Sequence, residues 1–513
     1  MASQSNFMFI DSQADHAHNL SLRNKKQVFV MTKYYQDQKQ ASIDRLKPRS
    51  APRGRRRLEH GAGTFPSTAK DRETAKHKGS KDNLPQRKPP IWSLEAYLSQ
   101  SFVDPLASSA VGMTDSMNQY FHHFRIHSII MCYPLDPMRM GMWWWQEAIT
   151  QPALLLTILF LSAGHQASLE MHNGVDPLVA EKTFRNCLRL RGRVLGTLKD
   201  IMEDPKKAVA EATALIIASL ASGETVNANF EALEIHMKGL QRLVHLLGGV
   251  EAIDHGALAK IYECDVRSAT LKNTRPVFAM SSRFRSEILQ HAKFFHTQEP
   301  LAIPRRLSQL GQSFFKALWY TQLDSSVRAY TQILHRLIIH YEEAQVCPSL
   351  ITPTDNDLFL VFEHQLLSAS YTSRPDDPHE PLRLSFLLYV NLRIWHFQGI
   401  PLTQYPAAAL RASLEASLAH ILKVAPDLLF WILWMGGLAS RGAECYAWFV
   451  ENLRTVANQL GLQNWVAARI LLGGFFYTDQ HGWEAEKAAE GELWREVVPE
   501  AHNETHHTPV IFI

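Results

Sequence analysis

Apolar residues recur every three or four positions through most of the chain after Trp92, a spacing that predicts amphipathic helices. The clearest predicted helix covers residues 228–247, where one apolar stripe steps by 3, 4, 3, 4 and 3: Phe230, Leu233, Met237, Leu240, Val244 and Leu247. Glu234 and Lys238 stand four residues apart and predict an ion pair on the flank of this helix. The pair Gly248-Gly249 predicts a left-handed C-cap that ends it.

Start and stop signals predict the other helices of the body. Asp176-Pro177 and Asp204-Pro205 each place an N-cap acceptor before a proline suited to the first helical position. We expect the second signal to open a helix that runs to Leu220 and stops at Gly223. Further helices are predicted at residues 282–295, 307–320, 325–344, 357–370, 382–397, 405–424, 427–439, 441–460, 465–477 and 484–497. No succession of strand patterns and no fixed-period repeat follows residue 90, so the predicted fold class is all-α.

Two apolar stretches require a membrane test. No charged residue lies between Glu147 and Glu170, but polar residues and a proline interrupt the stretch: Pro152, Thr157, Ser162, His165 and Gln166. Residues 428–439 are more uniformly apolar but short, whereas a spanning helix needs roughly 20 apolar residues. Both stretches are predicted to be buried helices, and we expect no membrane partner.

The first 90 residues differ in composition from the rest. Residues 41–90 are rich in proline, serine, glycine and lysine and poor in aliphatic residues, so we expect a disordered linker there. Residues 1–19 lack the apolar segment of a secretory signal, and residues 21–40 predict a short basic helix. The predicted organisation is therefore a basic segment, a linker, a helical body and a flexible tail: 1–40, 41–90, 91–498 and 499–513.

Composition and charge sharpen this division. The 513 residues are 46% hydrophobic and 20% charged, which excludes a collagen, a fully disordered chain and a multi-span membrane protein. The net charge of +3 conceals an asymmetry. Residues 1–90 hold 19 Lys and Arg against 8 Asp and Glu, a net +11, and the remaining residues hold 34 against 42, a net −8. A basic arm therefore precedes a mildly acidic body.

Candidate chemistry in the body is sparse. The sequence contains no phosphate-binding loop, dinucleotide fingerprint, zincin motif or nucleophile elbow, so we expect no enzyme and no cofactor. The five cysteines are scattered without a C-x-x-C pair, which predicts reduced thiols and no zinc site. His123 and His127 have a ligand-like spacing but no evident third ligand, and His502, His506 and His507 lie in the tail, so no metal site is predicted. Trp143, Trp144 and Trp145 point in three directions around a helix and predict core packing.

Candidate site residues lie in the basic arm. The densest cluster is predicted to bind nuclear import factors or to contact phosphates: Lys47, Arg49, Arg53, Arg55, Arg56 and Arg57. The short basic helix could contact DNA through Arg23, Lys25, Lys26 and Lys33. A solvated linker with incidental charge is the alternative. No helix-turn-helix, zinc finger or zipper is evident, so charge alone would give sequence-independent affinity.

Several phrases of the chain resemble the second fungal-specific transcription factor domain, an all-helical regulatory domain of ascomycete regulators. The resemblance covers roughly residues 92–498, and its most specific part is 229–240 with Gly248-Gly249. The other matching phrases are 7–11, 120–127, 133–135, 143–145, 152–165, 274–278, 434–437 and 448–450. Many such regulators carry a six-cysteine zinc cluster ahead of the domain, but residues 1–131 contain no cysteine.

The resemblance implies a nuclear regulator of a metabolic or secondary-metabolite gene cluster. Its partners would be DNA, reached directly or through a partner regulator, and nuclear import factors; a homodimer formed through the helical body could also supply specificity. Two alternatives stay open. One is a nuclear co-regulator that makes no DNA contact of its own, and the other is an accessory protein or helical enzyme of a biosynthetic cluster.

Overall fold

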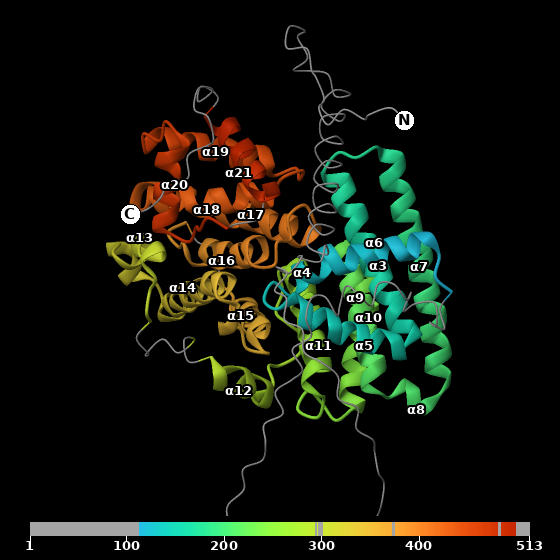
Figure 1. The fold of residues 1–513 in the computed structure, drawn as a ribbon. Helices are drawn as coiled ribbons and strands as arrows, with labels where there is room; N and C mark the ends of the chain where they lie inside the picture. Colours follow the sequence, from blue (N-terminus) through green and yellow to red (C-terminus); the bar gives the residue numbers. More distant parts are fainter. Residues whose placement is uncertain (1–111, 293–294, 296–300, 372–374, 481–483, 499–513) are drawn as a thin grey trace, which may run out of the picture. The chain divides into compact units, whose positions relative to one another are not determined.

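A computed structural model of the chain describes residues 112–292, 295, 301–371, 375–480 and 484–498. The predicted basic segment, linker and tail lie outside these residues. Every regular element in the described part is a helix, and no β-strand occurs there. The all-α class predicted from the sequence is therefore confirmed (Figure 1).

The first group of helices surrounds α6, which contacts α3, α5, α7, α9 and the π-helix η2. In chain order the elements of this group are α3 (Asp115–His123), η2 (Phe124–Ser128), α4 (Ile129–Cys132), α5 (Pro137–Thr150), α6 (Pro152–His172), α7 (Pro177–Glu203), α8 (Pro205–Ala208) and α9 (Glu211–Val226). Asp176 caps α7 as predicted, because its carboxylate accepts a hydrogen bond of 2.9 Å from the backbone N–H of Leu178.

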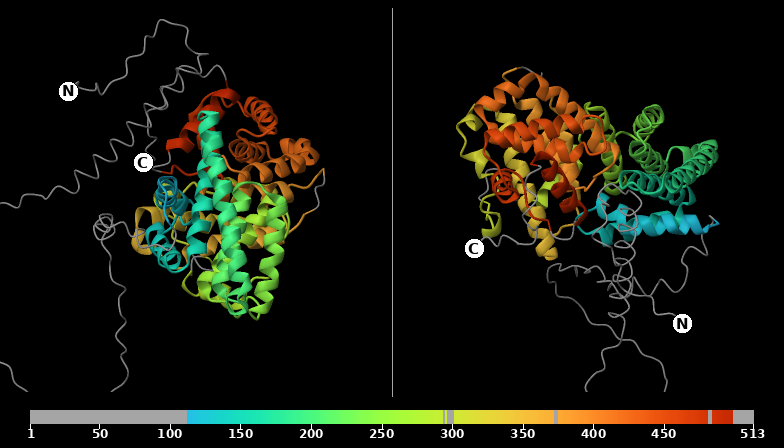
Figure 2. Two further views of the ribbon diagram at one scale, coloured as in Figure 1. Left: turned by 90° about the vertical axis from the view of Figure 1, so that its right-hand side faces the viewer. Right: turned by 90° about the horizontal axis from the view of Figure 1, so that it is seen from above.

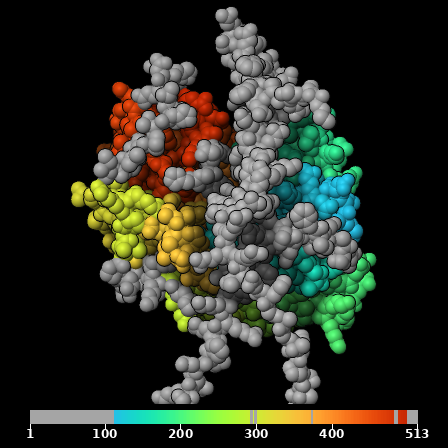
Figure 3. Space-filling model, viewed as in Figure 1, coloured from blue at the N-terminus to red at the C-terminus, as the bar shows by residue number. Residues whose placement is uncertain are grey.

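The second group extends from α10 to the end of the described chain. Its elements are α10 (Phe230–Leu246), α11 (His255–Lys272), α12 (Ser282–His291), the 3-10 turns η4 (Arg305–Leu307), η5 (Leu318–Gln322) and η6 (Pro348–Leu350), α13 (Gln312–Phe315), α14 (Ser325–Val346), α15 (Asp355–Ser368), α16 (His379–Arg393), α17 (Pro401–Val424), α18 (Pro426–Ala439), α19 (Tyr446–Gln459), α20 (Trp465–Gly474) and α21 (Glu484–Val497). In the space-filling view the cyan to green helices of the first group and the orange to red helices of the second lie on opposite sides of the visible face (Figure 3).

Helix α9 joins two hydrophobic cores. Leu215, Ile216 and Leu220 belong to the smaller core with residues of α3, α5, α6 and α7. Ala214, Ile217, Ala218 and Ala221 face the larger core, which continues through α10 to α21. Because both faces of α9 are covered, its apolar residues lie on every side of the helix and do not form one stripe. Seen from above, the cyan to green helices lie on one side of the described chain and the orange to red helices on the other (Figure 2).

The amphipathic helix predicted at residues 228–247 is confirmed as α10. Leu233, Met237, Leu240 and Val244 are buried, and Lys238 pairs with Glu234 at 2.6 Å. Gly248 and Gly249 have φ angles of +98° and +88°. Their backbone N–H groups donate to the carbonyls of His245 and Val244, a Schellman motif that satisfies the end of the helix.

The helix predicted from Asp204-Pro205 to Gly223 starts as predicted, because the Asp204 carboxylate accepts from the backbone N–H groups of Lys206 and Lys207, but the prediction of one continuous helix that stops at Gly223 is wrong. The chain forms the single turn α8, breaks at Val209 and Ala210, and begins α9 at Glu211. At its other end α9 continues past Gly223 to Val226. Gly223 does not end the helix. It allows α9 to pack closely against α6, because a Cβ atom at this position would lie 2.3 Å from Cε1 of Phe160 in α6.

The helix predicted at residues 307–320 is also wrong, because the segment divides into η4, α13 and η5. Gly311 has a φ angle of +76°, and its N–H donates a 2.8 Å hydrogen bond to the carbonyl of Phe475. That left-handed residue turns the chain between η4 and α13. The pattern of apolar residues in this segment reflects packing of successive short turns on the larger core.

Other predicted helices are present with shifted ends. α16 stops at Arg393 instead of residue 397, because His396 is left-handed with a φ angle of +54°. α12 ends at His291, α19 begins at Tyr446, and α20 ends at Gly474. The helix predicted at residues 484–497 has the bounds of α21.

Helix α6 is the one described helix that is long and apolar enough to cross a membrane by length and composition. In its most apolar window, 78% of the residues are buried inside the protein. Leu428 to Ala439 of α18 are likewise buried. Both stretches therefore lie in the hydrophobic interior, as the sequence predicts.

Candidate functional site

The residues predicted to bind import factors or phosphates lie outside the described part of the chain, as do those of the basic helix. Functional features are therefore sought in the helical body. Four features concentrate polar or aromatic side chains there: an exposed row of cations on α7, a cluster of histidines on α3 and α6, a buried chain of ion pairs, and a pocket beside α17.

Helix α7 has one buried face and one basic face. Ala180, Thr183, Cys187, Leu190 and Val194 pack inward against α6 and its neighbours. The opposite face is exposed and carries cations at steps of three, four and four residues: Lys182, Arg185, Arg189 and Arg193. We call these four residues the α7 row. It extends for about 16 Å, since an α-helix rises 1.5 Å per residue.

The α7 row is largely uncompensated by neighbouring acids. Arg185 pairs with Glu181 at 2.5 Å, and both side chains are more than half exposed, so the pair is weak. Arg189 donates to the amide oxygen of Asn186, and Arg193 approaches the sulfur of Met117 at 3.1 Å. These contacts hold the guanidinium groups near the helix without neutralising them. α7 lies at the right-hand edge of Figure 1.

A histidine cluster lies where η2 follows α3. The Nε2 atom of His123 is 2.9 Å from Nδ1 of His165 in α6, and the ring of His127 is 4.8 Å from that of His123. The spacing of His123 and His127 suggested that these two side chains lie close together. It could not indicate His165, which is 42 positions away from His123. A π-helix places an extra residue in the turn, a local feature that spacing rules do not predict.

The cluster is uncharged at neutral pH. Burial lowers the pKa of His123 to about 2, with a further contribution from repulsion by His165 and His127. Burial and His127 lower the pKa of His165 to about 3. Within the described residues, no group of three or more ligand-type side chains could hold a metal ion.

Trp143, Trp144 and Trp145 point into separate environments, as predicted. Trp144 is buried and donates a 2.9 Å hydrogen bond to the hydroxyl of Tyr133. The Trp145 ring lies 5.2 Å from that of Phe121, and Trp143 packs close to Gly256. They do not form one stacking surface.

A buried chain of ion pairs runs through α11 and α15. Lys260 pairs with Glu263, and Nη1 of Arg267 lies 2.8 Å from Oε1 of Glu363. The second oxygen of Glu363 accepts a 2.8 Å hydrogen bond from Trp395, whose ring also lies under the Arg267 guanidinium. Arg267 and Glu363 are 1% and 0% exposed, so this pair is inaccessible to a ligand and its role is structural.

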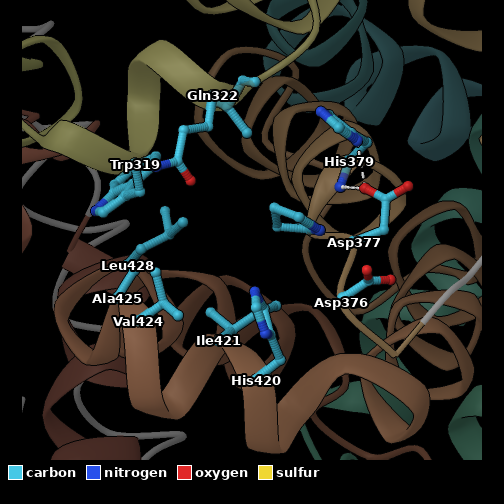
Figure 4. A pocket seen from close by; sticks show the side chains of 12 residues that line it. Trp319, Gln322, Asp376, Asp377, His379, His420, Ile421, Val424, Ala425 and Leu428 are labelled. Atoms are coloured by element: carbon cyan, nitrogen blue, oxygen red, sulfur yellow. Dashed lines mark hydrogen bonds and ion pairs between the residues drawn. The ribbon is translucent and has the colours of Figure 1, made fainter.

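A pocket of about 250 Å³ opens between η5, the segment before α16, and the junction of α17 and α18 (Figure 4). Its apolar wall consists of Trp319, Leu323, Ile421, Val424, Ala425 and Leu428. The remaining lining residues are Gln322, Asp376, Asp377, Pro378, His379 and His420. In Figure 4, Asp376 and Asp377 lie across the pocket from Trp319.

This pocket could not be predicted from the sequence, because its walls come from three segments spread over about 100 positions. Asp376, Asp377 and Pro378 directly precede α16, and that acid-proline pattern alone signals a helix start. His420 lies on the exposed side of α17, where a lone histidine carries no functional signal. Only the fold brings these polar groups to one opening.

Comparison with protein-family models, with curated proteins and with solved structures gave no match. The functional reasoning therefore starts from the chain's own charges, contacts and pocket.

Proposed function

We propose that this chain is a nuclear transcriptional regulator of the fungal type, in which the basic arm and the α7 row contact nucleic-acid phosphates. The observation that carries the proposal is the α7 row itself. The chain after residue 90 has a net charge of −8, yet four cations line one exposed face of one helix within it. A row of this kind suits a partner with a regular line of negative charge, such as a phosphate backbone.

The chemistry of the row limits what it can recognise. Arginine and lysine side chains that contact phosphates fix orientation and supply affinity, but they do not read base sequence. Selectivity for particular promoters would then require a homodimer or a DNA-binding partner. On its own, the chain would accordingly bind DNA weakly, with an affinity that falls as the salt concentration rises.

The pocket bears on the enzymatic alternative. It collects two aspartates and two histidines, the kind of convergent ionisable groups that an active site needs. The imidazole of His379, however, is held at both nitrogens: Nδ1 contacts Asp377, and Nε2 accepts a 3.0 Å hydrogen bond from the N–H of Asp324. Both ring nitrogens are thus occupied. This arrangement favours ligand binding over acid–base catalysis.

A salt titration tests the proposal. Changing the α7 row to glutamine (K182Q, R185Q, R189Q and R193Q) in the full chain should flatten the slope of log K against log salt on duplex DNA. The expected change is up to about 3.6, at roughly 0.9 per phosphate contact. A matched control changes four exposed lysines or arginines on separate elements: Lys238, Arg285, Lys316 and Lys423.

The two variants carry the same net charge, so a difference between them reports the arrangement of the cations. Equal slopes for the row variant and the wild-type chain would contradict a phosphate contact by α7. A full chain that binds no duplex at all would instead favour the co-regulator that acts through a DNA-binding partner.

A further inference from the structure

We propose that the pocket beside α17 binds a small organic amine, a molecule that joins a cationic nitrogen to a compact aromatic or branched apolar body. This inference goes beyond the contact with nucleic acid and does not depend on it. Its basis is the division of the pocket into an apolar wall and an acidic side, together with its size.

Most of the apolar wall belongs to the larger core or packs against it, and Val424 is its exposed member at 46%. Leu323, Ile421 and Leu428 belong to the larger core and are at most 5% exposed. Trp319 presents its ring at the opening, and that ring is packed edge-on against Phe314 at 6.1 Å. An apolar ligand body would therefore displace water from a preformed surface without ordering new side chains.

The acidic side is ordered by hydrogen bonds. The backbone N–H of Asp324 donates to Nε2 of His379, so that nitrogen is the acceptor and Nδ1 faces Asp377. Its Nδ1–H then donates to Asp377, and stacking of the ring on Tyr371 at 5.6 Å helps to hold this orientation. Asp377 thus supplies a carboxylate to this side of the pocket, and this carboxylate also accepts a 2.9 Å hydrogen bond from the backbone N–H of His379.

Asp376 adds a second negative charge. Its side chain is exposed, and no hydrogen bond or ion pair joins its carboxylate to another residue in the described part of the chain. The described lining of the pocket includes no lysine or arginine. A cation is therefore the complementary group, and Asp376 is the carboxylate available to receive its hydrogen bonds.

The pocket volume restricts the occupant. About 250 Å³ is below the roughly 300–1,000 Å³ of pockets that enclose drug-sized ligands. An amine with one ring or one short branched chain fits, whereas a peptide or nucleotide would lie mostly outside. His420 and Gln322, on the α17 and η5 walls, are placed to contact polar substituents of such a molecule.

Calorimetry of the full chain at pH 7.5 with three probes of similar shape tests the charge preference. The probes are 2-phenylethylamine (a cation), 2-phenylethanol (neutral) and 3-phenylpropanoate (an anion). We expect the amine to bind at least ten times more tightly than the alcohol, which corresponds to about 1.4 kcal/mol, and the carboxylate to bind most weakly. Absence of amine binding, or equal affinity for amine and carboxylate, would overturn the proposal.

Variants locate the binding. D376N should weaken the amine at least tenfold and leave the alcohol unchanged, because it removes the charge and keeps the shape. H420K should have the same selective effect, since it brings a cation into the pocket. E415Q is the matched control, because Glu415 is an exposed acid of α17 outside the pocket that pairs with Arg411. Wild-type amine affinity in D376N, or an equal loss in E415Q, would refute the assignment. DNA affinity is measured separately, so failure here leaves the proposed function untouched.

Discussion

Gly223 offers a direct test of the packing between α6 and α9. Its missing side chain lets the two helices approach until a Cβ atom would lie 2.3 Å from Cε1 and 2.7 Å from Cδ1 of Phe160. Phe160 is fully buried, so its ring has no free space into which it could turn. The change G223A therefore forces either the ring or the whole of α9 to move.

Two opposing effects set the magnitude. Alanine favours the helical state over glycine by about 1 kcal/mol. Overpacking a tight core costs typically about 1–3 kcal/mol, and a contact this short lies at the upper end. We expect a net loss of about 1–2 kcal/mol in the free energy of unfolding, measured by urea denaturation of the purified chain.

A control and a rescue separate these effects. Gly239 is exposed within α10 and would place a Cβ atom in open space, so G239A should stabilise the chain by up to about 1 kcal/mol. Replacing Phe160 by leucine opens room beside Gly223, so G223A should cost less in that background. A G223A variant at least as stable as the wild-type chain would refute the reasoning.

Three further predictions concern the core, the histidines and the arm. M237D should lower the free energy of unfolding by more than about 3 kcal/mol in urea denaturation, because Met237 is 4% exposed and the new charge has no partner. His165 has a pKa of about 3, below its ordinary value of 6.5, so the unfolded chain binds more protons and stability falls as the pH drops below about 6.5. Its contribution approaches about 1.4 kcal/mol per pH unit, and H165N should flatten the pH dependence of the urea midpoint. In a fluorescent fusion, nuclear signal should move to the cytoplasm when alanine replaces Arg53, Arg55, Arg56 and Arg57, and an unchanged nuclear signal would contradict their role in import.

Features fixed by neighbouring residues could be predicted from the sequence. The stripe and glycine cap of α10 depend only on residues of that helix and its end, and the cap that Asp176 makes at the start of α7 is equally local. The spacing of the cations on α7 can likewise be seen in the sequence. That they form an exposed row follows only from the structure, in which the other face of the helix is buried. Fold class followed from many such local signals acting together.

Features fixed by distant residues could not be predicted. Gly223 has the sequence signature of a helix end, and only the position of Phe160 shows that it permits close packing. His165 meets His123 across two helices, and the pocket joins η5 to α17 over about 100 positions. No spacing rule addresses contacts of this range, because they depend on how whole helices pack.

The buried pair of Arg267 and Glu363 has a consequence for inheritance. Loss of either partner alone leaves a charge in the interior and costs about 3–5 kcal/mol, whereas an apolar pair of similar volume can be as stable as the ion pair. During evolution, the ion pair can therefore be replaced without a large loss of stability only when both positions change almost together. Among related sequences, positions 267 and 363 should carry either two opposite charges or two apolar residues, and mixed combinations should be rare.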